Sequence, residues 1–299
     1  MFRKRTDLAL EIHELHGEKS GISVEETEKN GLTVTTATIK PGEGEKLSGK
    51  NAGKYITVDI GNLRRAEKKV FENIAKTVAN EIKTLLSGKK GCVLVAGLGN
   101  ENITPDSIGP KTVKKLLVTR HIETIDSALF KSAGFGCVAA INPGVLGQTG
   151  IESAEIIKSV CENIKPSCVI VVDSLASRRL NRLATTVQLS DGGISPGSGV
   201  ANKRAELSER TLGVPVVSIG VPTVVDAATL AFDLLEEHLG ADEDFASEIE
   251  QLLVGEGKNM FVTPKENDII AEETAKLLSA SINIALHNME INEINEFLN

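Results

Sequence analysis

Short apolar runs rich in β-branched residues alternate along this chain with segments whose apolar residues recur at helical spacing. The predicted strands cover residues 92–98, 136–142, 168–173, 185–189 and 214–220. The predicted helices cover residues 66–87, 110–120, 152–164, 224–238 and 268–298. A strand that is buried on both faces of a parallel sheet is typically such an uninterrupted apolar run. The alternation therefore predicts an α/β fold of three layers, with a mostly parallel sheet flanked by helices.

Two stretches depart from this alternation. Residues 25–60 contain the period-two patterns of half-exposed strands, at 32–39 and 55–60, and predict a small β-rich attachment. Residues 240–265 carry no regular pattern and are expected to form an irregular insertion. Of the 299 residues, 41% are hydrophobic, which is enough for one large core, so we predict a single α/β domain.

The charge balance and the targeting signals narrow the class of protein. The chain has 41 acidic and 33 basic residues, a formal net charge of −8, and no run of basic and aromatic residues that would form a nucleic-acid face. No stretch approaches the ~20 apolar residues of a membrane span, and the N-terminus lacks the apolar block of a signal peptide. The four cysteines form no CxxC pair and are typical of reduced core thiols. These features predict a soluble intracellular protein without direct contact to nucleic acid or membrane.

Two aspartates follow predicted strands at positions that would bring their carboxylates together. Asp106 lies in the loop after the strand 92–98, and Asp173 ends the apolar run 168–173. In open α/β sheets, ligands collect outside the carboxyl ends of the strands. Two carboxylates that converge there can share a proton and activate water against an amide bond. A carboxylate that directly follows an apolar strand is also expected to be partly desolvated, which raises its pKa. We therefore take Asp106 and Asp173 as the candidate catalytic pair.

These motifs also allow other interpretations. Thr104 could instead cap a helix whose first turn contains Asp106, where the helix dipole favours a negative charge. The Gly-Leu-Gly-Asn segment at 97–100 lacks the third glycine of a dinucleotide-binding loop. The segment 193–197 matches the G-x-S-x-G pattern of serine hydrolases, but Pro196 follows the serine and has no N–H for an oxyanion hole. The five histidines show no metal-ligand spacing, so neither a metal nor a cofactor is expected.

With the chemistry narrowed to a carboxylate pair, several blocks of sequence around it form a recognisable set. They are Arg-Thr-Asp-Leu-Ala at 5–9, Gly-Leu-Gly-Asn at 97–100, Thr-Pro-Asp at 104–106, Leu-Gly-Gln-Thr-Gly at 146–150, Val-Val-Asp-Ser-Leu-Ala at 171–176 and Ile-Ser-Pro-Gly-Ser-Gly at 194–199. In this order, and over most of the chain, they resemble the germination protease family of spore-forming bacteria. The resemblance implies an α/β fold related to the hydrogenase-maturation proteases, without their nickel-sensing metal site.

The resemblance also implies an activity. Proteins of this family are endopeptidases that degrade small acid-soluble spore proteins when a spore germinates, and they are made as zymogens that remove a short propeptide. We therefore expect a homotetramer in the cytoplasm of the forespore and in the spore core, with residues 1–7 as the propeptide and 8–299 as the protease domain. The two aspartates proposed as catalytic in the family correspond to Asp106 and Asp173.

The expected enzyme is an atypical aspartic endopeptidase. One carboxylate of the pair would activate water while the other, protonated, polarises the scissile carbonyl. Backbone N–H groups of the glycine loop around Gly97, Gly99 and Asn100 are expected to stabilise the oxyanion. Two alternatives stay open, a metal-dependent maturation protease and a non-catalytic partner-binding protein in which both aspartates are structural. Catalysis by the pair requires both carboxylates to face one cleft.

The N-terminal segment is itself expected to be a substrate. Residues 6–11, Thr-Asp-Leu-Ala-Leu-Glu, resemble the Thr-Glu-Ile-Ala-Ser-Glu stretch that the family cuts after its first acidic residue. Both have an acid before the bond, a branched aliphatic residue after it, and a second acid four residues beyond the first. We therefore expect self-processing between Asp7 and Leu8. The alternative is that Asp7 and Glu11 are solvated charges on a short N-terminal helix.

Overall fold

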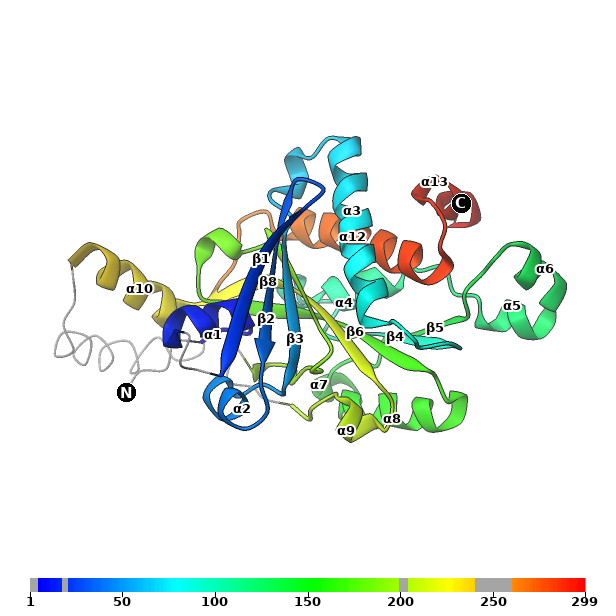
Figure 1. The fold of residues 1–299 in the computed structure, drawn as a ribbon, viewed down its shortest axis with the longest axis horizontal. Coiled ribbons are helices and arrows are strands. Elements are labelled where there is room, and N and C mark those ends of the chain that lie inside the picture. The colour runs from blue at the N-terminus through cyan, green and yellow to red at the C-terminus, as the bar shows by residue number, and fades with distance from the viewer. Residues whose placement is uncertain (1–4, 18–20, 199–203, 240–259, 299) are drawn as a thin grey trace.

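The computed structural model describes residues 5–17, 21–198, 204–239 and 260–298, which form a sheet with helices on both faces (Figure 1). The strands are β1 (Ile22–Lys29), β2 (Leu32–Ile39), β3 (Gly53–Asp59), β4 (Val93–Gly97), β5 (Val138–Ile141), β6 (Cys168–Ser177), β7 (Thr186–Ser190), β8 (Val216–Asp226) and β9 (Phe261–Val262). The longer helices are α1 (Ala9–His16), α3 (Lys68–Leu85), α8 (Ser153–Ile164), α10 (Ala227–Leu239), α12 (Asn267–His287) and α13 (Ile291–Leu298). The shorter helices are α2 (Glu43–Ser48), α4 (Ile108–Val113), α5 (Arg120–Ile125), α6 (Ser127–Ser132), α7 (Leu146–Thr149) and α9 (Glu209–Leu212).

The sheet combines a parallel and an antiparallel half. In the described part of the chain the strand order is β1-β2-β3-β7-β8-β6-β4-β5, and β9 pairs with β8. Strands β8, β6, β4 and β5 are parallel, whereas β1, β2, β3 and β7 pair antiparallel. The predicted α/β class, with helices flanking the sheet, is confirmed, and the sheet is mixed. Strand direction was not evident from the sequence because β7 is buried at every position, like a central parallel strand.

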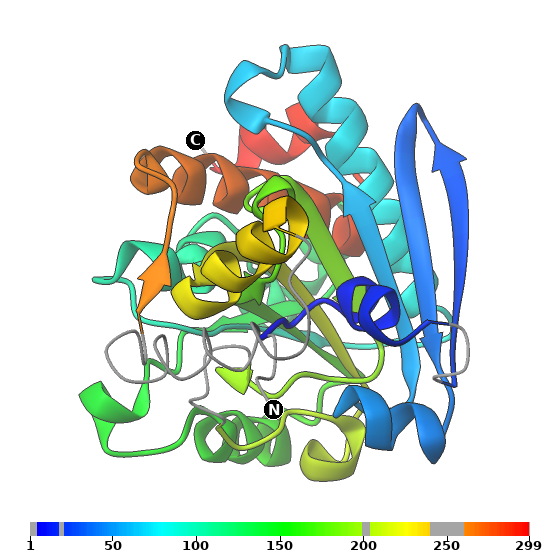
Figure 2. The same cartoon turned by 90° about the vertical axis from the view of Figure 1, so that its left-hand side faces the viewer.

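The strands predicted as a β-rich attachment continue the main sheet. Strands β1, β2 and β3 form an antiparallel meander, and Tyr55–Asp59 of β3 pair with Thr186–Ser190 of β7. Figure 2 shows the blue β1–β2 hairpin at the edge of the sheet. Of the predicted irregular insertion, 240–265, residues 240–259 lie outside the described residues, and the short strand β9 follows them.

Two predicted helices are shorter than the pattern suggested. The helix predicted over 110–120 corresponds to α4, which ends at Val113. The helix predicted over 268–298 is divided into α12 and α13. Asn288 causes the break, because it has a φ of 54° and its left-handed conformation ends α12.

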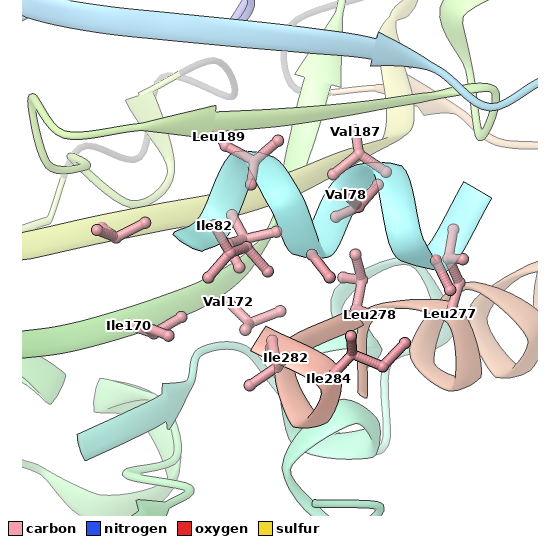
Figure 3. Packing of buried hydrophobic residues seen from close by; sticks show 14 of the residues in the cluster. Val78, Ile82, Ile170, Val172, Val187, Leu189, Leu277, Leu278, Ile282 and Ile284 are labelled. Atoms are coloured by element: carbon pink, nitrogen blue, oxygen red, sulfur yellow. The ribbon is translucent and has the colours of Figure 1, made fainter. Parts of the chain in front are cut away.

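Apolar side chains fill the space on both faces of the sheet. Figure 3 shows the main cluster, in which side chains of α3 and α12 pack against Ile170 and Val172 of β6 and against β7. On the opposite face, α8 and α9 pack against Val169 and Val171. Successive residues of a strand point to opposite faces. The next residue of β6, Asp173, therefore points to the face that α8 covers.

Candidate active site

Asp173 lies on β6 beside the end of the neighbouring strand β4. Strand β4 pairs with β6 as far as Gly97, opposite Val172, while β6 continues to Ser177 alongside β8. Asp173 therefore does not end its strand, as the sequence suggested, but is the first residue of β6 beyond the last pairing with β4. Its side chain is only 5% exposed. The end of β4 thus opens a space above the sheet while β6 still holds Asp173 rigidly.

Asp106 reaches the same place from the loop that follows β4. It is the last residue of the 3₁₀ turn Thr104–Asp106, and its Oδ2 accepts a hydrogen bond from the backbone N–H of Asn100 at 2.7 Å. The N-cap position of this turn is Ile103 and Thr104 is its first residue, so Thr104 does not occupy the alternative capping position. Asp106 and Asp173 both line a cavity of about 570 Å³, which is the arrangement that catalysis by the pair requires.

Gly99 allows the loop to fold around Asp106. Its φ of +109° lies in a region that residues with a side chain rarely adopt, and a Cβ would lie 2.0 Å from the carbonyl oxygen of Asp106. Gly99 and Asn100 line the cavity of about 570 Å³, which is the larger of two at this site, whereas Gly97 packs against the backbone of Gly109 in α4. In this structure the N–H of Asn100 holds the Asp106 carboxylate, so it is already engaged within the candidate pair.

Burial governs the protonation of the two aspartates. Burial raises the pKa of Asp173 well above its usual range, the negative charges of Asp106 and Asp7 raise it further, and a hydrogen bond from Ser174 N–H opposes them. Burial also raises the pKa of Asp106, and the hydrogen bond from Asn100 N–H opposes that change. The pKa of both carboxyl groups is thus raised, and that of buried Asp173 is raised more strongly than that of half-buried Asp106. A neutral acid beside a charged base is the usual state of two carboxylates that titrate as a unit.

The larger cavity also contains part of the chain's own N-terminus. Asp7 lines it together with both aspartates. The backbone N–H of Asp7 donates to the carbonyl oxygen of Ala176 at 2.8 Å, so the segment lies against the end of β6. Asp7 is 7% exposed, and Leu8 is completely buried. Asp7, the residue before the expected cleavage point, therefore lines the same cavity as the candidate pair.

The carboxylate of Asp7 is held by specific donors. Its Oδ2 accepts from the N–H of Ala176 at 2.9 Å, and its Oδ1 accepts from the hydroxyl of Ser198 at 2.6 Å. Lys50 lines a second, adjoining cavity of about 220 Å³ together with Asp7 and Asp173. Burial lowers the pKa of Lys50, and the charge of Asp7 opposes this change. The acid that precedes the bond is therefore bound by two hydrogen-bond donors in a pocket that contains one cation.

Glu11, the second acid of the segment, is bound in the same manner. Its fully buried carboxylate accepts from the backbone N–H groups of Arg178 at 2.7 Å and Arg179 at 3.0 Å, and it lies 3.4 Å from the guanidinium of Arg182. Burial raises the pKa of Glu11, and these contacts together with the Thr6 hydroxyl oppose the rise. Neither acid is solvated, so the alternative of exposed charges on a short helix does not describe this segment.

Three residues of the site were not identified from the sequence: Lys50, Gln188 and Ser198, which line the smaller cavity. Gln188 had only a weak signal, since it is one of three polar residues that alternate with Val187 and Leu189 along β7. Lys50 and Ser198 lie in loops and carry no such signal. Ser195, of the rejected serine-hydrolase pattern, also lines the smaller cavity.

Other groups that are often catalytic lie elsewhere. Neither cavity is lined by a histidine or a cysteine, and His287 is buried at the end of α12, where its Nε2 lies 2.9 Å from the carbonyl oxygen of Leu117. Among the residues that the structure describes, no three His, Cys, Asp or Glu side chains are grouped so that they could hold a metal ion. In the same residues, no helix has the length and apolar character needed to cross a membrane.

Comparison with known proteins gives a consistent set of relatives. The family model described as "Germination protease" matches residues 4–248. The germination protease of Caldanaerobacter subterraneus subsp. tengcongensis is 43% identical over 98% of this chain and 98% of its own length. That of Clostridium acetobutylicum is 41% identical over 99% of both chains, and that of Bacillus licheniformis is 37% identical over 95% of this chain and 93% of its own. Among solved structures, the [NiFe] hydrogenase maturation protease HycI from Thermococcus kodakarensis aligns with a TM-score of 0.37 at 17% identity, covering 68% of this chain and 98% of that chain.

Proposed function

The chain belongs to the germination protease family, and we propose that within it the protein is an atypical aspartic endopeptidase that initiates the degradation of small acid-soluble spore proteins. Family membership makes it a protease, a hydrolase of peptide bonds. One observation carries the catalytic type: Asp106 and Asp173 line one cavity, and the chain's own Asp7 lines it with them. From the family resemblance we also propose a homotetramer that acts in the cytoplasm of the forespore and in the spore core.

The proposed reaction uses the two aspartates in different protonation states. Ionised Asp106 takes a proton from water, the water oxygen bonds to the carbonyl carbon, and protonated Asp173 donates a hydrogen bond to the carbonyl oxygen. The bond between carbon and nitrogen then breaks, and the proton held by Asp106 passes to the leaving amine. The upward pKa shift of Asp173, which is caused first by burial and then by the charge of Asp106, supports this assignment.

The substrate class follows from the residues that surround the N-terminal segment. Asp7 and Glu11 are both held by backbone N–H groups and by side chains of opposite charge or hydroxyl character. A peptide with two acids four residues apart and an aliphatic residue after the first acid would make the same contacts. We propose that small acid-soluble spore proteins are cut at such a sequence and that residues 1–7 are a propeptide.

Self-processing is the first test of this function. Full-length protein is expected to convert to a form whose N-terminal sequence is Leu-Ala-Leu-Glu-Ile, because Asp7, which precedes the proposed cleavage point, lines one cavity with the two aspartates. N-terminal sequencing and intact-mass measurement of active enzyme check this outcome. Variants that lack either catalytic aspartate should retain Met1. Active enzyme that always keeps an intact N-terminus would show that this chain is not a self-activating zymogen.

Inhibitors distinguish this mechanism from its alternatives. Cleavage of a small acid-soluble spore protein is expected to continue in EDTA, after thiol alkylation and after treatment with serine-directed reagents. The reason is that the proposed steps use no metal ion, no cysteine thiol and no serine hydroxyl. The Ser195→Ala variant should cleave at an ordinary rate although Ser195 lines the smaller cavity. The assay is the disappearance of the substrate on a gel. Complete loss of activity on chelation, with recovery on addition of zinc or nickel, would instead support the metal-dependent maturation protease.

A further inference from the structure

The side chain of Gln188 forms hydrogen bonds with the N-terminal segment on both sides of Leu8. Its Nε2 donates to the carbonyl oxygen of Asp7 at 3.1 Å, and its Oε1 accepts from the N–H of Ala9 at 2.8 Å. The two contacts define the orientation of the amide. In the reverse orientation, Oε1 would face the carbonyl oxygen of Asp7 and Nε2 would face the N–H of Ala9, so two acceptors and two donors would meet. The carbonyl oxygen that Gln188 contacts belongs to the bond between Asp7 and Leu8.

Gln188 and Asp173 lie in one row across three neighbouring strands. Gly220 of β8 is paired with Asp173 of β6 on one side and with Gln188 of β7 on the other. Residues paired in this way point to the same face of a sheet, and neighbouring strands are ~4.8 Å apart. The flanking residues Val187 and Leu189 point into the core beneath α3, which leaves Gln188 on the face of Asp173. Gln188 is 7% exposed, so solvent does not compete for its amide.

Gly220 of β8, the position between Asp173 and Gln188, has no side chain. A Cβ on Gly220 would lie 2.5 Å from the side chain of Leu175, and Leu175, Gly220, Gln188 and Asp173 all line the smaller cavity together with Asp7. A peptide backbone can therefore lie across β8 with an acid on one side of it and a carboxamide on the other. The observed segment contacts the strands on both sides of β8, since the N–H of Asp7 donates to Ala176 of β6 and its carbonyl oxygen accepts from Gln188 of β7.

We propose that Gln188 is a catalytic residue, whose amide N–H donates to the scissile carbonyl oxygen and stabilises the oxyanion that forms when water adds to it. This assignment rests on the proposed protease function and deepens it. As the water oxygen bonds to the carbonyl carbon, the π electron pair of the carbonyl moves to oxygen, the proton of water passes to Asp106, and Gln188 neither gains nor loses a proton. Its Oε1 at the same time holds the N–H of the second residue after the bond, which aligns the substrate with the carboxylates.

A neutral carboxamide suits this position for a physical reason. It carries an N–H donor and a carbonyl acceptor on separate atoms of one uncharged planar group, as the carbonyl of Asp7 and the N–H of Ala9 require. A carboxylate at the same position would place another negative charge near Asp173, whose pKa the nearby carboxylates already raise. The oxyanion donor is therefore a side chain of β7, on the opposite side of Asp173 from the loop 97–100.

The rate of self-processing of the full-length chain tests this proposal. Gln188→Met, which removes both hydrogen bonds at similar volume, is expected to slow the conversion followed by intact mass by about 100-fold, the typical loss when one oxyanion donor is removed. Gln188→Glu keeps an acceptor for Ala9 and loses the donor, so it is expected to be slowed to a similar degree. Thr186→Val is the matched control, since Thr186 is 5% exposed on the same strand and lines neither cavity. It should process at the rate of the wild type.

Hydrogen exchange at the Ala9 amide separates catalysis from simple docking. The proposal expects this amide in Gln188→Glu to remain protected as in the unprocessed Asp173→Asn protein, while processing is slow. Loss of protection together with loss of processing would reduce Gln188 to a docking contact and overturn the oxyanion role. Processing of both Gln188 variants within ~3-fold of the wild type would also overturn it and would leave the protease function intact. Failure of the wild type to process, in enzyme that still cleaves a small acid-soluble spore protein, would overturn the proposal, because Asp7 and Leu8 would then not be a substrate of this site; absence of cleavage of either substrate would remove the proposed function itself.

Discussion

Asp173→Asn and Asp106→Asn are each expected to lower peptide cleavage by at least ~100-fold while the protein remains folded. Asparagine has the size of aspartate and can still accept the hydrogen bonds from Ser174 and Asn100, so the positions of the side chains should change little. It can neither take a proton from water nor act as an acid. The measurement is the rate of cleavage of a small acid-soluble spore protein, with the fold checked by circular dichroism. Near-normal turnover by either folded variant would remove that residue from the mechanism.

Asp173→Asn should raise the thermal stability of the protein although it lowers the rate of cleavage. Asp173 has a raised pKa in the folded state, so its ionised form is disfavoured there, and folding loses stability as the pH rises through that pKa. Asp173→Asn should therefore melt at a higher temperature than the wild type at neutral pH. The difference should vanish as the pH falls below the usual pKa of an aspartate, about 3.9, where both states of the wild type hold the proton. The measurement is the melting temperature of the variant minus that of the wild type, followed from neutral pH to below pH ~3.9.

A paired aspartate provides the control for that measurement. Asp233 is also buried, but its Oδ2 lies 2.7 Å from the guanidinium Nε of Arg178. Asp233→Asn removes the negative charge that lies against the buried guanidinium of Arg178 and should lower the melting temperature. An equal change of melting temperature in the two variants would show that the raised pKa of Asp173 does not lower the stability of the fold. Opposite behaviour is expected because one carboxylate is held by a cation and the other is surrounded by carboxylates.

The parts of the site that could be predicted from the sequence are those controlled by local pattern. The run 168–172 is apolar because β6 is covered on both faces, and Asp173 is the first residue at which that requirement ends. The direction of the neighbouring β7 and its pairing with β3 depend on contacts between distant segments, which no local pattern records. The continuation of β6 past Asp173 was hidden for the same reason, since β8 provides the pairing.

Residues that reach the site from distant elements were the ones that could not be predicted. Lys50 follows the helix α2 and Ser198 follows β7, and each becomes part of the site through the position of Asp7. Gln188 differs from these two. It lies in β7, where polar Thr186, Gln188 and Ser190 alternate with apolar residues although all five positions are buried. A buried amide must find hydrogen-bond partners, and here the partners are the backbone groups on either side of Leu8. The period-two pattern indicates which face Gln188 lies on but not which segment it binds.

Gly99→Ala is expected to lower cleavage by at least ~100-fold without altering either aspartate. The new Cβ would lie 2.0 Å from the carbonyl oxygen of Asp106 and 2.9 Å from its Oδ1, so the turn that carries the carboxylate must move. A displacement of about 1 Å in a catalytic group can cost ~100-fold in rate. The positive φ adds a backbone strain of ~1–3 kcal/mol, which should appear as a lower midpoint of denaturant unfolding.

Gly31→Ala is the matched control for this substitution. Gly31 has a φ of +74° in the turn between β1 and β2, and a Cβ there would have no atom within 4 Å. It therefore experiences the backbone strain without the collision, and its variant should unfold more easily yet cleave at the rate of the wild type. Equal activity of both variants would mean that Asp106 does not depend on Gly99 for its position. Loss of activity in Gly99→Ala alone would identify the loop 97–100 as the support that places Asp106 beside Asp173.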